Sequence, residues 1–454
     1  MNRLLIPSEL RDAVEAHLGA AAPLEEGLFL LTKPGRAAGG ARLVAFEAIL
    51  PEEDSWERQG SSELTPSGQW LSATMSRACT LSAGLALVHS HPHPWHPTGL
   101  SPLDLDTFRH LAPAVEDVTG CAFAMIAVSS RGWSGNVSHR GLIRDLHCID
   151  AIGPGLLPLA PPGGMEDELL DSRQILALGE SNRDLRSLAV AVIGCGGTGS
   201  AVAEQLYRMG VAKLVLVDDD TLDTESNLRR VAGARYSDAH TLPAPAKVDV
   251  VASHLAQIAL PETEVLAIRG DVRDETVARQ VLDCDLVVGA TDTHGSRGLL
   301  NDLAYAYALP VIDVGARVAA PKGELEGLWV DRRVLIPGRP CLWCTGEIDQ
   351  ATIRSESLDP EDREALAAEG YVAGTLDQAQ PSIIALNALA ASLASCSVPA
   401  LLGEQAECVP DRTVFDAVFG DSIPASSNGR SGCRCSSILL QADSAPIGFR
   451  REVL

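Results

Sequence analysis

A glycine-rich loop between an apolar segment and a helical pattern is the feature that most constrains the fold of this chain. Residues 188–194 (LAVAVIG) form a short apolar run typical of buried parallel strands. The loop VIGCGGTGS then places Gly194, Gly196 and Gly199 in G-x-G-x-x-G spacing before SAVAEQLYRMG, which has a helical pattern. Main-chain N–H groups in such a loop can hold phosphates at a helix N-terminus.

Strand and helix patterns continue to alternate after this loop. Further strands are expected at 213–218 (KLVLVD), 285–291 (DLVVGAT) and 309–316 (LPVIDVGA). This alternation predicts an α/β fold with a doubly wound parallel sheet.

A Gly/Pro-rich segment divides the chain. Of the 12 residues in 153–164 (GPGLLPLAPPGG), 8 are Gly or Pro, which excludes a helix or a central strand. At about 150 residues per domain, a chain of 454 residues has room for two or three domains. We therefore expect one domain at 1–152, a linker at 153–168 and a second domain at 169–454.

The first of these domains also has an α/β pattern. A helix with Ser8 as its N-cap is expected, because Leu10, Val14 and Leu18 recur on one helical face. Strands are expected at 27–33, 41–50, 84–91 and 121–129. The domain is therefore predicted to be a mixed α/β unit.

Charge and hydropathy exclude several classes of partner. Lys and Arg total 36 against 60 Asp and Glu, a net charge of −24, which disfavours nucleic acid and anionic lipid. The start MNRLLIPSELRDAVE has charges too early for a secretory signal, and the most apolar window, 381–402, contains Asn387 and serines typical of a buried helix. Without an export signal, the 11 cysteines are expected to be reduced or metal-bound, and the protein to be cytoplasmic.

The sequence HSHPHPWHPTGLSPLD, residues 89–104, has the composition of a metal site. His89 and His91 point to one side of a strand, and Asp104 adds a carboxylate, which makes three ligands and leaves a fourth position open for water. Zinc held there would lower the pKa of that water toward about 7. Ser101 can donate a hydrogen bond to an oxyanion. A histidine-rich loop that binds metal adventitiously is the alternative, and the S-x-x-D pattern argues against it.

An upstream Glu, then H-x-H, then S-x-x-D, resembles the JAMM (MPN/JAB) metallo-isopeptidase family over about residues 1–150. The resemblance implies that these three ligands hold a catalytic zinc ion and that Ser101 stabilises the oxyanion. It also implies a glutamate as general base, for which PLEEGLFLL offers Glu25 and Glu26, and the register of the apolar run favours Glu25. Nine residues separate His91 from Ser101, more than the family pattern leads us to expect.

Polar residues downstream of the glycine loop define a second constellation. Asp218 follows the next strand, where a carboxylate can bind a ribose diol, and an NAD-dependent oxidoreductase shares this feature. An adenylating enzyme additionally needs cations for a triphosphate and a carboxylate for Mg²⁺. Residues suited to those tasks are Asn227 and Arg230 in SNLRR, Lys247, and Asp292 with Arg297 in TDTHGSR.

These motifs, in this order, resemble the ThiF-type family, from about residue 171 to the C-terminus. The resemblance implies a Rossmann-like domain that uses ATP and Mg²⁺ to adenylate the C-terminal glycine of a small ubiquitin-like or sulfur-carrier protein. It implies that Asp218 binds ribose, that Asn227, Arg230 and Lys247 contact phosphates, and that Asp292 handles Mg²⁺. Arg173, in DSRQ, matches an arginine that family homodimers insert into the partner's site.

Two departures from the ThiF-type pattern affect these assignments. The spacing from Asp218 to Asn227 is one residue longer than usual, so Asp219 or Asp220 can take the ribose or metal role. Thr293 stands where the family often has Asn.

Two cysteine pairs suggest a second zinc site. Cys341 and Cys344 are in C-x-x-C spacing, and Cys433 and Cys435 are in C-x-C spacing. The family often carries a structural zinc ion on two such pairs, and four thiolates make a closed site. The second pair is tighter than usual, so Cys408 is an alternative ligand.

A thioester-forming cysteine is not evident. No cysteine occurs between Thr345 and Ser395, the crossover segment where the family resemblance implies one. Cys396 falls in an apolar helical pattern and is expected to be buried, and Cys195 is expected to pack inside the glycine loop. Adenylation is therefore favoured over thioester transfer.

Both halves imply the same kind of substrate. We expect a bifunctional protein that trims or removes a ubiquitin-like modifier and adenylates its terminal glycine. The alternatives are an adenylating enzyme for a small molecule or tRNA base with a non-catalytic N-terminal domain, an NAD-dependent oxidoreductase, and a scaffold that only binds the modifier.

Overall fold

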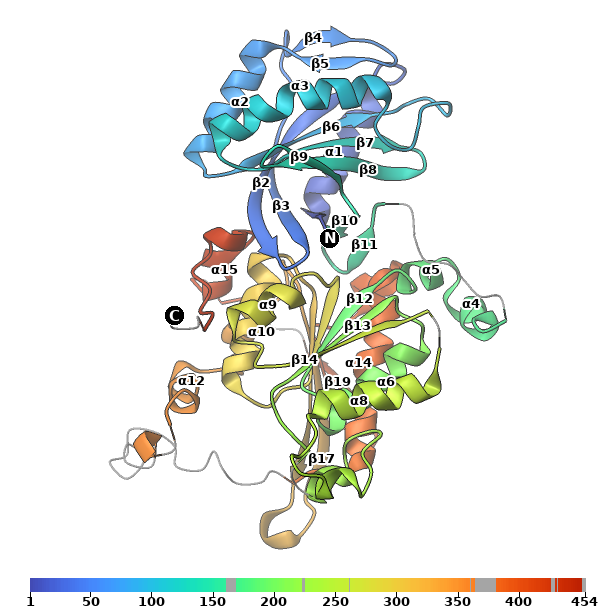
Figure 1. Cartoon of the computed structure of the whole chain (residues 1–454), viewed down its shortest axis with the longest axis vertical. Coiled ribbons are helices and arrows are strands. Elements are labelled where there is room, and N and C mark those ends of the chain that lie inside the picture. Colours follow the sequence, from blue (N-terminus) through green and yellow to red (C-terminus); the bar gives the residue numbers. More distant parts are fainter. Residues whose placement is uncertain are drawn as a thin grey trace. The chain divides into compact units, whose positions relative to one another are not determined.

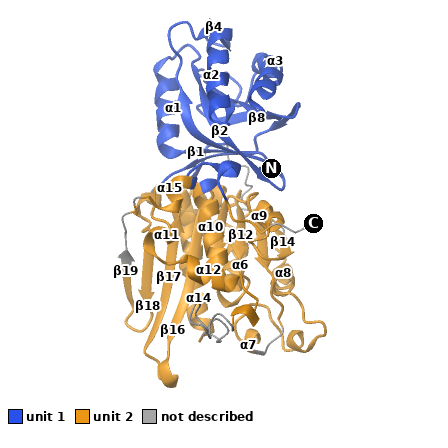
Figure 2. Ribbon diagram, turned by 90° about the vertical axis from the view of Figure 1, so that its left-hand side faces the viewer, with its two compact units in different colours: residues 1–162, 306–308, 438–446 blue, residues 163–305, 309–437, 447–454 orange. Residues whose placement is uncertain are grey.

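The computed structural model contains two compact units (Figure 2). Unit 1 comprises residues 1–162, 306–308 and 438–446, and unit 2 comprises 163–305, 309–437 and 447–454. The structure describes residues 1–160, 169–222, 225–260, 262–359, 361–363, 381–425, 429–430 and 432–450.

Unit 1 is built on a nine-stranded sheet in the order β11-β10-β1-β3-β2-β6-β7-β8-β9. Its strands are β1 (Arg3–Pro7), β2 (Gly27–Ala37), β3 (Gly40–Ile49), β6 (Gly84–Ser90), β7 (Phe123–Ser129), β8 (Gly132–His139), β9 (Leu142–Asp145), β10 (Cys148–Ile152) and β11 (Leu156–Pro158). A separate hairpin joins β4 (Trp56–Gln59) to β5 (Leu64–Pro66). The strands predicted in this region are confirmed to within a few residues.

Helices cover both faces of this sheet: α1 (Ser8–Ala20) lies on one face, and α2 (Gly68–Thr80) and α3 (Pro102–Thr119) lie on the other (Figure 1). Because strand side chains alternate, Leu30 of β2 packs with α1 and Leu31 packs with α2 and α3. On β6, Leu85 and Leu87 belong to the second of these cores. His89 therefore also faces the side covered by α2 and α3.

Two details of unit 1 differ from the prediction. Helix α1 starts at Ser8, but Pro7 occupies the N-cap position, so the Ser8 hydroxyl makes no cap hydrogen bond. Strand β11 lies inside the predicted linker. It is an edge strand that pairs only with β10, and Pro158 is compatible with an edge because a missing N–H there removes no interior ladder bond. Residues 161–168 of the predicted linker lie outside the described residues.

Unit 2 contains an eight-stranded sheet in the order β14-β13-β12-β15-β16-β17-β18-β19. Its strands are β12 (Ala189–Ile193), β13 (Lys213–Asp218), β14 (Glu264–Arg269), β15 (Leu286–Gly289), β16 (Val311–Ala319), β17 (Gly327–Leu335), β18 (Arg412–Asp416) and β19 (Asp421–Ala425). The first five strands in this order are parallel, as predicted. Strands β17, β18 and β19 extend the sheet antiparallel, which the prediction did not include.

The longer helices of unit 2 are α6 (Gly197–Arg208), α8 (Lys247–Ile258), α9 (Glu275–Val281), α10 (His294–Ala306) and α14 (Ile384–Leu402). Shorter ones are α4 (Ser172–Leu178), α5 (Ser181–Leu185), α7 (Glu225–Leu228), α11 (Leu342–Thr345), α12 (Gln350–Glu356) and α15 (Arg434–Ile438). Helices α6 and α8 lie on one side of the sheet, and α9 and α10 lie on the other (Figure 1). The winding direction therefore reverses between β12 and β15, and the carboxyl ends of these two strands form the crevice where such sheets bind ligands.

Helix α14 is long and apolar enough to cross a membrane by length and composition alone, and it is the one such helix among the described residues. Half of its apolar window is buried, and it packs against α6 and β16, in agreement with the predicted core helix. Cys396 was expected to be buried there, and that expectation is wrong: the side chain is exposed, between buried Ser395 and Ser397. Because α14 is apolar on every side, its sequence does not reveal which face is covered.

Candidate functional sites

In unit 1 the structure brings His89, His91 and Asp104 together, with ligand atoms all within 4.8 Å of one another. His89 Nε2 lies 3.4 Å from Asp104 Oδ1, and His91 Nε2 lies 3.3 Å from Asp104 Oδ2. All three side chains are buried. His91 Nδ1 is 2.9 Å from the carbonyl oxygen of Pro97, an acceptor that directs Nε2 toward the other ligands.

The start of helix α3 fixes the position of Asp104. Ser101 is the N-cap: its Oγ accepts the Asp104 N–H at 3.2 Å, while Asp104 Oδ2 accepts the Ser101 N–H at 2.7 Å. This capping box is the local reason for the S-x-x-D spacing. Burial opposes ionisation of Asp104, but the charge of nearby His89 and hydrogen bonds with His91 and Ser101 hold its pKa well below the ordinary value. Asp104 is therefore a carboxylate, as a zinc ligand must be.

The structure distinguishes Glu25 from Glu26. Gly27 of β2 pairs with His89 of β6, and side chains two residues apart on a strand share a face, so Glu25 points to the side of His89. Burial raises the pKa of Glu25, and the charges of His89 and Asp104 also act on it. Glu26 instead accepts hydrogen bonds from its neighbours in the sheet and the β4–β5 hairpin.

Unpartnered atoms show that this cluster fits a metal ion and a bound water. Among the described residues, His89 Nε2 and Glu25 Oε2 are buried and make no hydrogen bond. A zinc ion on the three ligands would satisfy His89, and its water would satisfy Glu25. The sequence patterns did not single out His96, which the structure buries within 4.0 Å of Glu25; the extra length of its loop was the available signal.

In unit 2 the glycine loop lies at the carboxyl end of β12. Gly194 has φ of +88°, and a Cβ at Gly199 would overlap the Gly194 carbonyl oxygen, so neither position accepts a side chain without strain. A Cβ at Gly196 would meet open space. The space beside Gly196 and the N-terminus of α6 together suit a phosphate group.

Asp218 holds the glycine loop directly. One of its oxygens accepts the Cys195 N–H at 2.6 Å and the other accepts the Asp220 N–H at 2.9 Å, while burial raises its pKa. Asp219 and Asp220 are exposed, and Lys247 Nζ lies 2.5 Å from Asp220 Oδ2. The carboxylates of Asp218, Asp219 and Asp220 come within 4.8 Å of one another. The structure therefore does not distinguish which of the three would take the ribose or metal role.

The other predicted nucleotide residues differ in their surroundings. Arg230 Nη2 donates to Asn227 Oδ1 at 3.1 Å. This bond links Asn227, which lies on α7, to Arg230, which follows that helix. Asp292 is exposed between β15 and α10. Arg297 instead forms a two-bond ion pair with Asp313 of β16, with distances of 2.7 and 3.1 Å, and this pair ties α10 to the sheet.

Two further expectations concern residues outside this cluster. Arg173 is exposed on α4, and its role in a partner's site stays a prediction. Residues 364–380 of the crossover segment, where a thioester cysteine was sought, lie outside the described residues.

The four predicted cysteines form a cluster in unit 2. Cys341 Sγ lies 3.4 Å from Cys344 Sγ and 3.5 Å from Cys433 Sγ, and Cys344 Sγ lies 3.7 Å from Cys435 Sγ. Hydrogen bonding with Cys341 lowers the pKa of Cys435 to about 5. Such a set suits a closed four-thiolate zinc site. Cys408 is exposed and does not belong to the cluster.

Cys195 lies buried in the glycine loop, as expected. Its side chain is inaccessible, and burial raises the pKa of its thiol well above the ordinary value. A thiol in that state is a poor nucleophile.

Together, the fold and the glycine loop of unit 2 define a Rossmann-like α/β protein with its glycine-rich loop at the point where the winding of the sheet reverses. Residues 172–421 match the model of the ThiF family, which is more than half of the chain. The chain belongs to the ThiF family.

Curated relatives match shorter stretches. The tRNA threonylcarbamoyladenosine dehydratase of Bacillus subtilis is 40% identical over 125 residues, covering 27% of this chain and 46% of the relative. The SAMP-activating enzyme E1 of Haloferax volcanii is 29% identical over 165 residues, covering 36% and 56%. The chain thus spans about half the length of these two relatives.

One further curated relative and one solved structure are also similar to this chain. The molybdopterin-synthase adenylyltransferase of Escherichia coli is 29% identical over 186 residues, covering 40% of this chain and 70% of the relative. The crystal structure of Escherichia coli MccB aligns at a TM-score of 0.45 with 18% identity, covering 61% of this chain and 74% of that one.

Proposed function

We propose that unit 2 uses ATP to adenylate the C-terminal carboxylate of a small ubiquitin-like or sulfur-carrier protein. The observation that carries this proposal is the glycine loop at the winding reversal, with Asp218 and Lys247 beside it, in a member of the ThiF family. Two relatives, named as a SAMP-activating enzyme E1 and a molybdopterin-synthase adenylyltransferase, support the same chemistry.

The proposed reaction assigns each charged group a task. A carboxylate oxygen of the modifier attacks the α-phosphorus of ATP, the bond to the β-phosphate oxygen breaks, and pyrophosphate leaves. Lys247 and Arg230 bind the phosphates and offset their growing negative charge, with Asn227 orienting Arg230. Asp218 or its neighbours bind the ribose, and Asp292 would hold Mg²⁺, which neutralises phosphate charge when bound.

We further propose that unit 1 is a JAMM-type zinc (iso)peptidase for the same modifier. The buried set of His89, His91 and Asp104, with Glu25 beside it, supports this assignment. Zinc bound there would polarise a peptide carbonyl and acidify water. Glu25 would take the water proton and pass it to the leaving amine, and Ser101 would donate to the oxyanion.

A second zinc ion is proposed for the four-cysteine cluster, in a structural role. Four buried or half-buried thiols within contact distance are costly unless they bind a metal or each other, and all 11 cysteines are free of disulfides. Reduced thiols of this kind fit a cytoplasmic location, and we propose that location for the protein.

Intact-mass measurement tests both activities at once. The substrate is a small β-grasp protein whose terminal glycine is followed by a short extension, incubated with and without ATP and Mg²⁺. Loss of the extension without ATP, and addition of an AMP mass with ATP, are expected. His89→Ala should abolish only the first change and Lys247→Ala only the second. Demonstrated binding with neither change would favour the scaffold alternative.

A second candidate acceptor is a tRNA base or a small molecule. The 40% identity to a tRNA-modifying dehydratase favours it, whereas the net charge of −24 disfavours binding to RNA. Pyrophosphate release that requires tRNA, with no modifier adenylate, would decide for this alternative. Tight NADH binding without ATP turnover would decide for an oxidoreductase, an alternative that family membership disfavours. We also propose that the chain forms a homodimer through unit 2, as the match of Arg173 to the family pattern implies, and size-exclusion chromatography with light scattering tests this.

A further inference from the structure

His96 is a buried polar side chain that the proposed zinc site leaves unexplained. It lies in the nine-residue loop between His91 and Ser101, and only 7% of its surface is exposed. Neither ring nitrogen makes a hydrogen bond to any residue that the structure describes. Its Nδ1 lies 4.0 Å from Glu25 Oε1.

Zinc and its water leave these two nitrogens without partners. The metal would satisfy His89 Nε2 and the water would satisfy Glu25 Oε2, but His96 is not among the atoms that gather within 4.8 Å. Buried donors and acceptors in native proteins nearly always have a partner. The Glu25 carboxylate, with Oε1 4.0 Å from His96 Nδ1, lies beside this ring and can accept a hydrogen bond.

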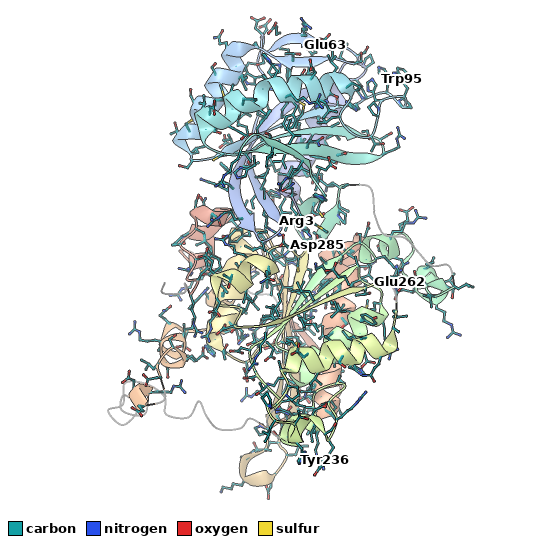
Figure 3. The ribbon with its side chains drawn as sticks, viewed as in Figure 1. Arg3, Glu63, Trp95, Tyr236, Glu262 and Asp285 are labelled. Atoms are coloured by element: carbon teal, nitrogen blue, oxygen red, sulfur yellow. The ribbon has the colours of Figure 1, made fainter. Side chains whose placement is uncertain are left out.

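The loop holds the His96 ring in one place. Its ring packs edge-on against His91 and His93, with centroids 5.1 and 5.2 Å away. Its main-chain N–H donates to the His93 carbonyl at 3.0 Å, and its carbonyl accepts Arg131 Nη2 at 3.0 Å. Trp95 of the same loop is 75% exposed at the surface (Figure 3), so the loop turns one ring outward and one inward.

We propose that His96 is a positioning residue for hydrolysis, whose ring N–H donates to the Glu25 carboxylate and aims its other oxygen at the zinc-bound water. A hydrogen bond requires this 4.0 Å separation to shorten by about 1 Å. The proposal rests on the proposed peptidase function of unit 1. It gives the long loop between the H-x-H and S-x-x-D motifs a task, because that loop supplies the ring.

Four single variants and one double variant test the proposal. His96→Phe keeps the ring packing and removes the donor, His96→Gln keeps a donor, and His93→Phe is the matched control in the same loop. For His96→Phe we expect kcat to fall about 10–100-fold with KM and zinc content unchanged, the range found when residues that orient a metal site are changed. His96→Gln should recover part of that loss, and His93→Phe should cleave like the native protein. Adding His96→Phe to Glu25→Gln should cost nothing more.

Any of three results would overturn the proposal. These are a native kcat in His96→Phe, a loss of zinc from that variant, or a full additional loss of kcat when His96→Phe is added to Glu25→Gln. A crystal structure of the zinc-loaded protein decides the matter even if no peptidase substrate is found. A His96 nitrogen within hydrogen-bond distance of the Glu25 carboxylate supports the proposal. A His96 nitrogen coordinated to zinc would contradict it. So would a ring N–H that donates to the main chain of Ser61, a group that also influences the pKa of this ring.

Discussion

The side chain of Asn387, on α14, lies directly against Gly197, the first residue of α6. A Cβ added at Gly197 would overlap Asn387 Nδ2. Asn387 is buried, and its Nδ2 donates to Ser382 Oγ at 3.1 Å. A residue far along the chain therefore supports the end of the glycine loop, and the G-x-G-x-x-G pattern gives no indication of it.

Gly197→Ala should weaken nucleotide binding and destabilise the protein by about 1–3 kcal/mol, the usual cost of overpacking. Asn387→Ala in the same chain should recover much of both losses, because it removes the overlapping amide. Gly196→Ala is the matched control for the loss of stability, since a Cβ there meets open space in the ligand-free protein. Thermal unfolding and calorimetric titration with a non-hydrolysable ATP analogue measure the two effects. Equal losses of stability in Gly196→Ala and Gly197→Ala would contradict this account.

Glu25→Gln and Glu26→Gln should have opposite effects, although the residues are neighbours. Glu25→Gln should reduce cleavage about 10²–10⁴-fold without unfolding the protein, because a general base is lost. Glu26 accepts the Gly27 N–H at 2.9 Å and the Trp56 indole N–H at 3.0 Å, so Glu26→Gln should cost about 1–3 kcal/mol of stability while cleavage remains. Chemical denaturation and cleavage rates, measured on both variants, check the pair.

Metal analysis should find about two zinc ions per chain. His89→Ala and Cys341→Ser should each lose about one, and only Cys341→Ser should lower the unfolding temperature of unit 2, because its zinc site is closed and structural. Cys408→Ser, an exposed cysteine outside the cluster, should keep both ions. One ion in the native protein, retained by Cys341→Ser, would rule out zinc at the cysteine cluster.

The stability of the metal-free protein should rise between about pH 5 and pH 9. The pKa of Cys435 is lowered from 9.0 to about 5 in the folded chain, so the unfolded state binds more protons within that window. The stabilisation is complete above the unfolded pKa and is lost as the pH falls through the folded one. Unfolding temperatures of the chelator-treated, reduced protein should therefore climb with pH, and Cys435→Ser should flatten that slope. A native slope identical to that of Cys435→Ser would contradict the assignment.

Local patterns in the sequence were sufficient for several central strands of both sheets and for the candidate ligand triad. Period-2 alternation placed His89 and His91 on one side of a strand, and S-x-x-D placed Asp104 in a first helical turn, because both depend on backbone geometry over a few residues. The strand–helix alternation predicted the parallel part of the sheet in unit 2 for the same reason. The antiparallel strands β17, β18 and β19 were missed, and the pairing of β17 with β18, which sets Val330 opposite Phe415, depends on segments far apart in the chain.

Packing between distant segments decided the remainder. The buried position of Cys435, the exposure of Cys396 and the contact of Asn387 with Gly197 all depend on which face of an element another element covers. The inward turn of His96 likewise required the folded loop. The sequence by itself determined which residues can bind metal and phosphate. Only the tertiary structure decided which of them meet, because burial and long-range contact are properties of the packed chain rather than of any local pattern.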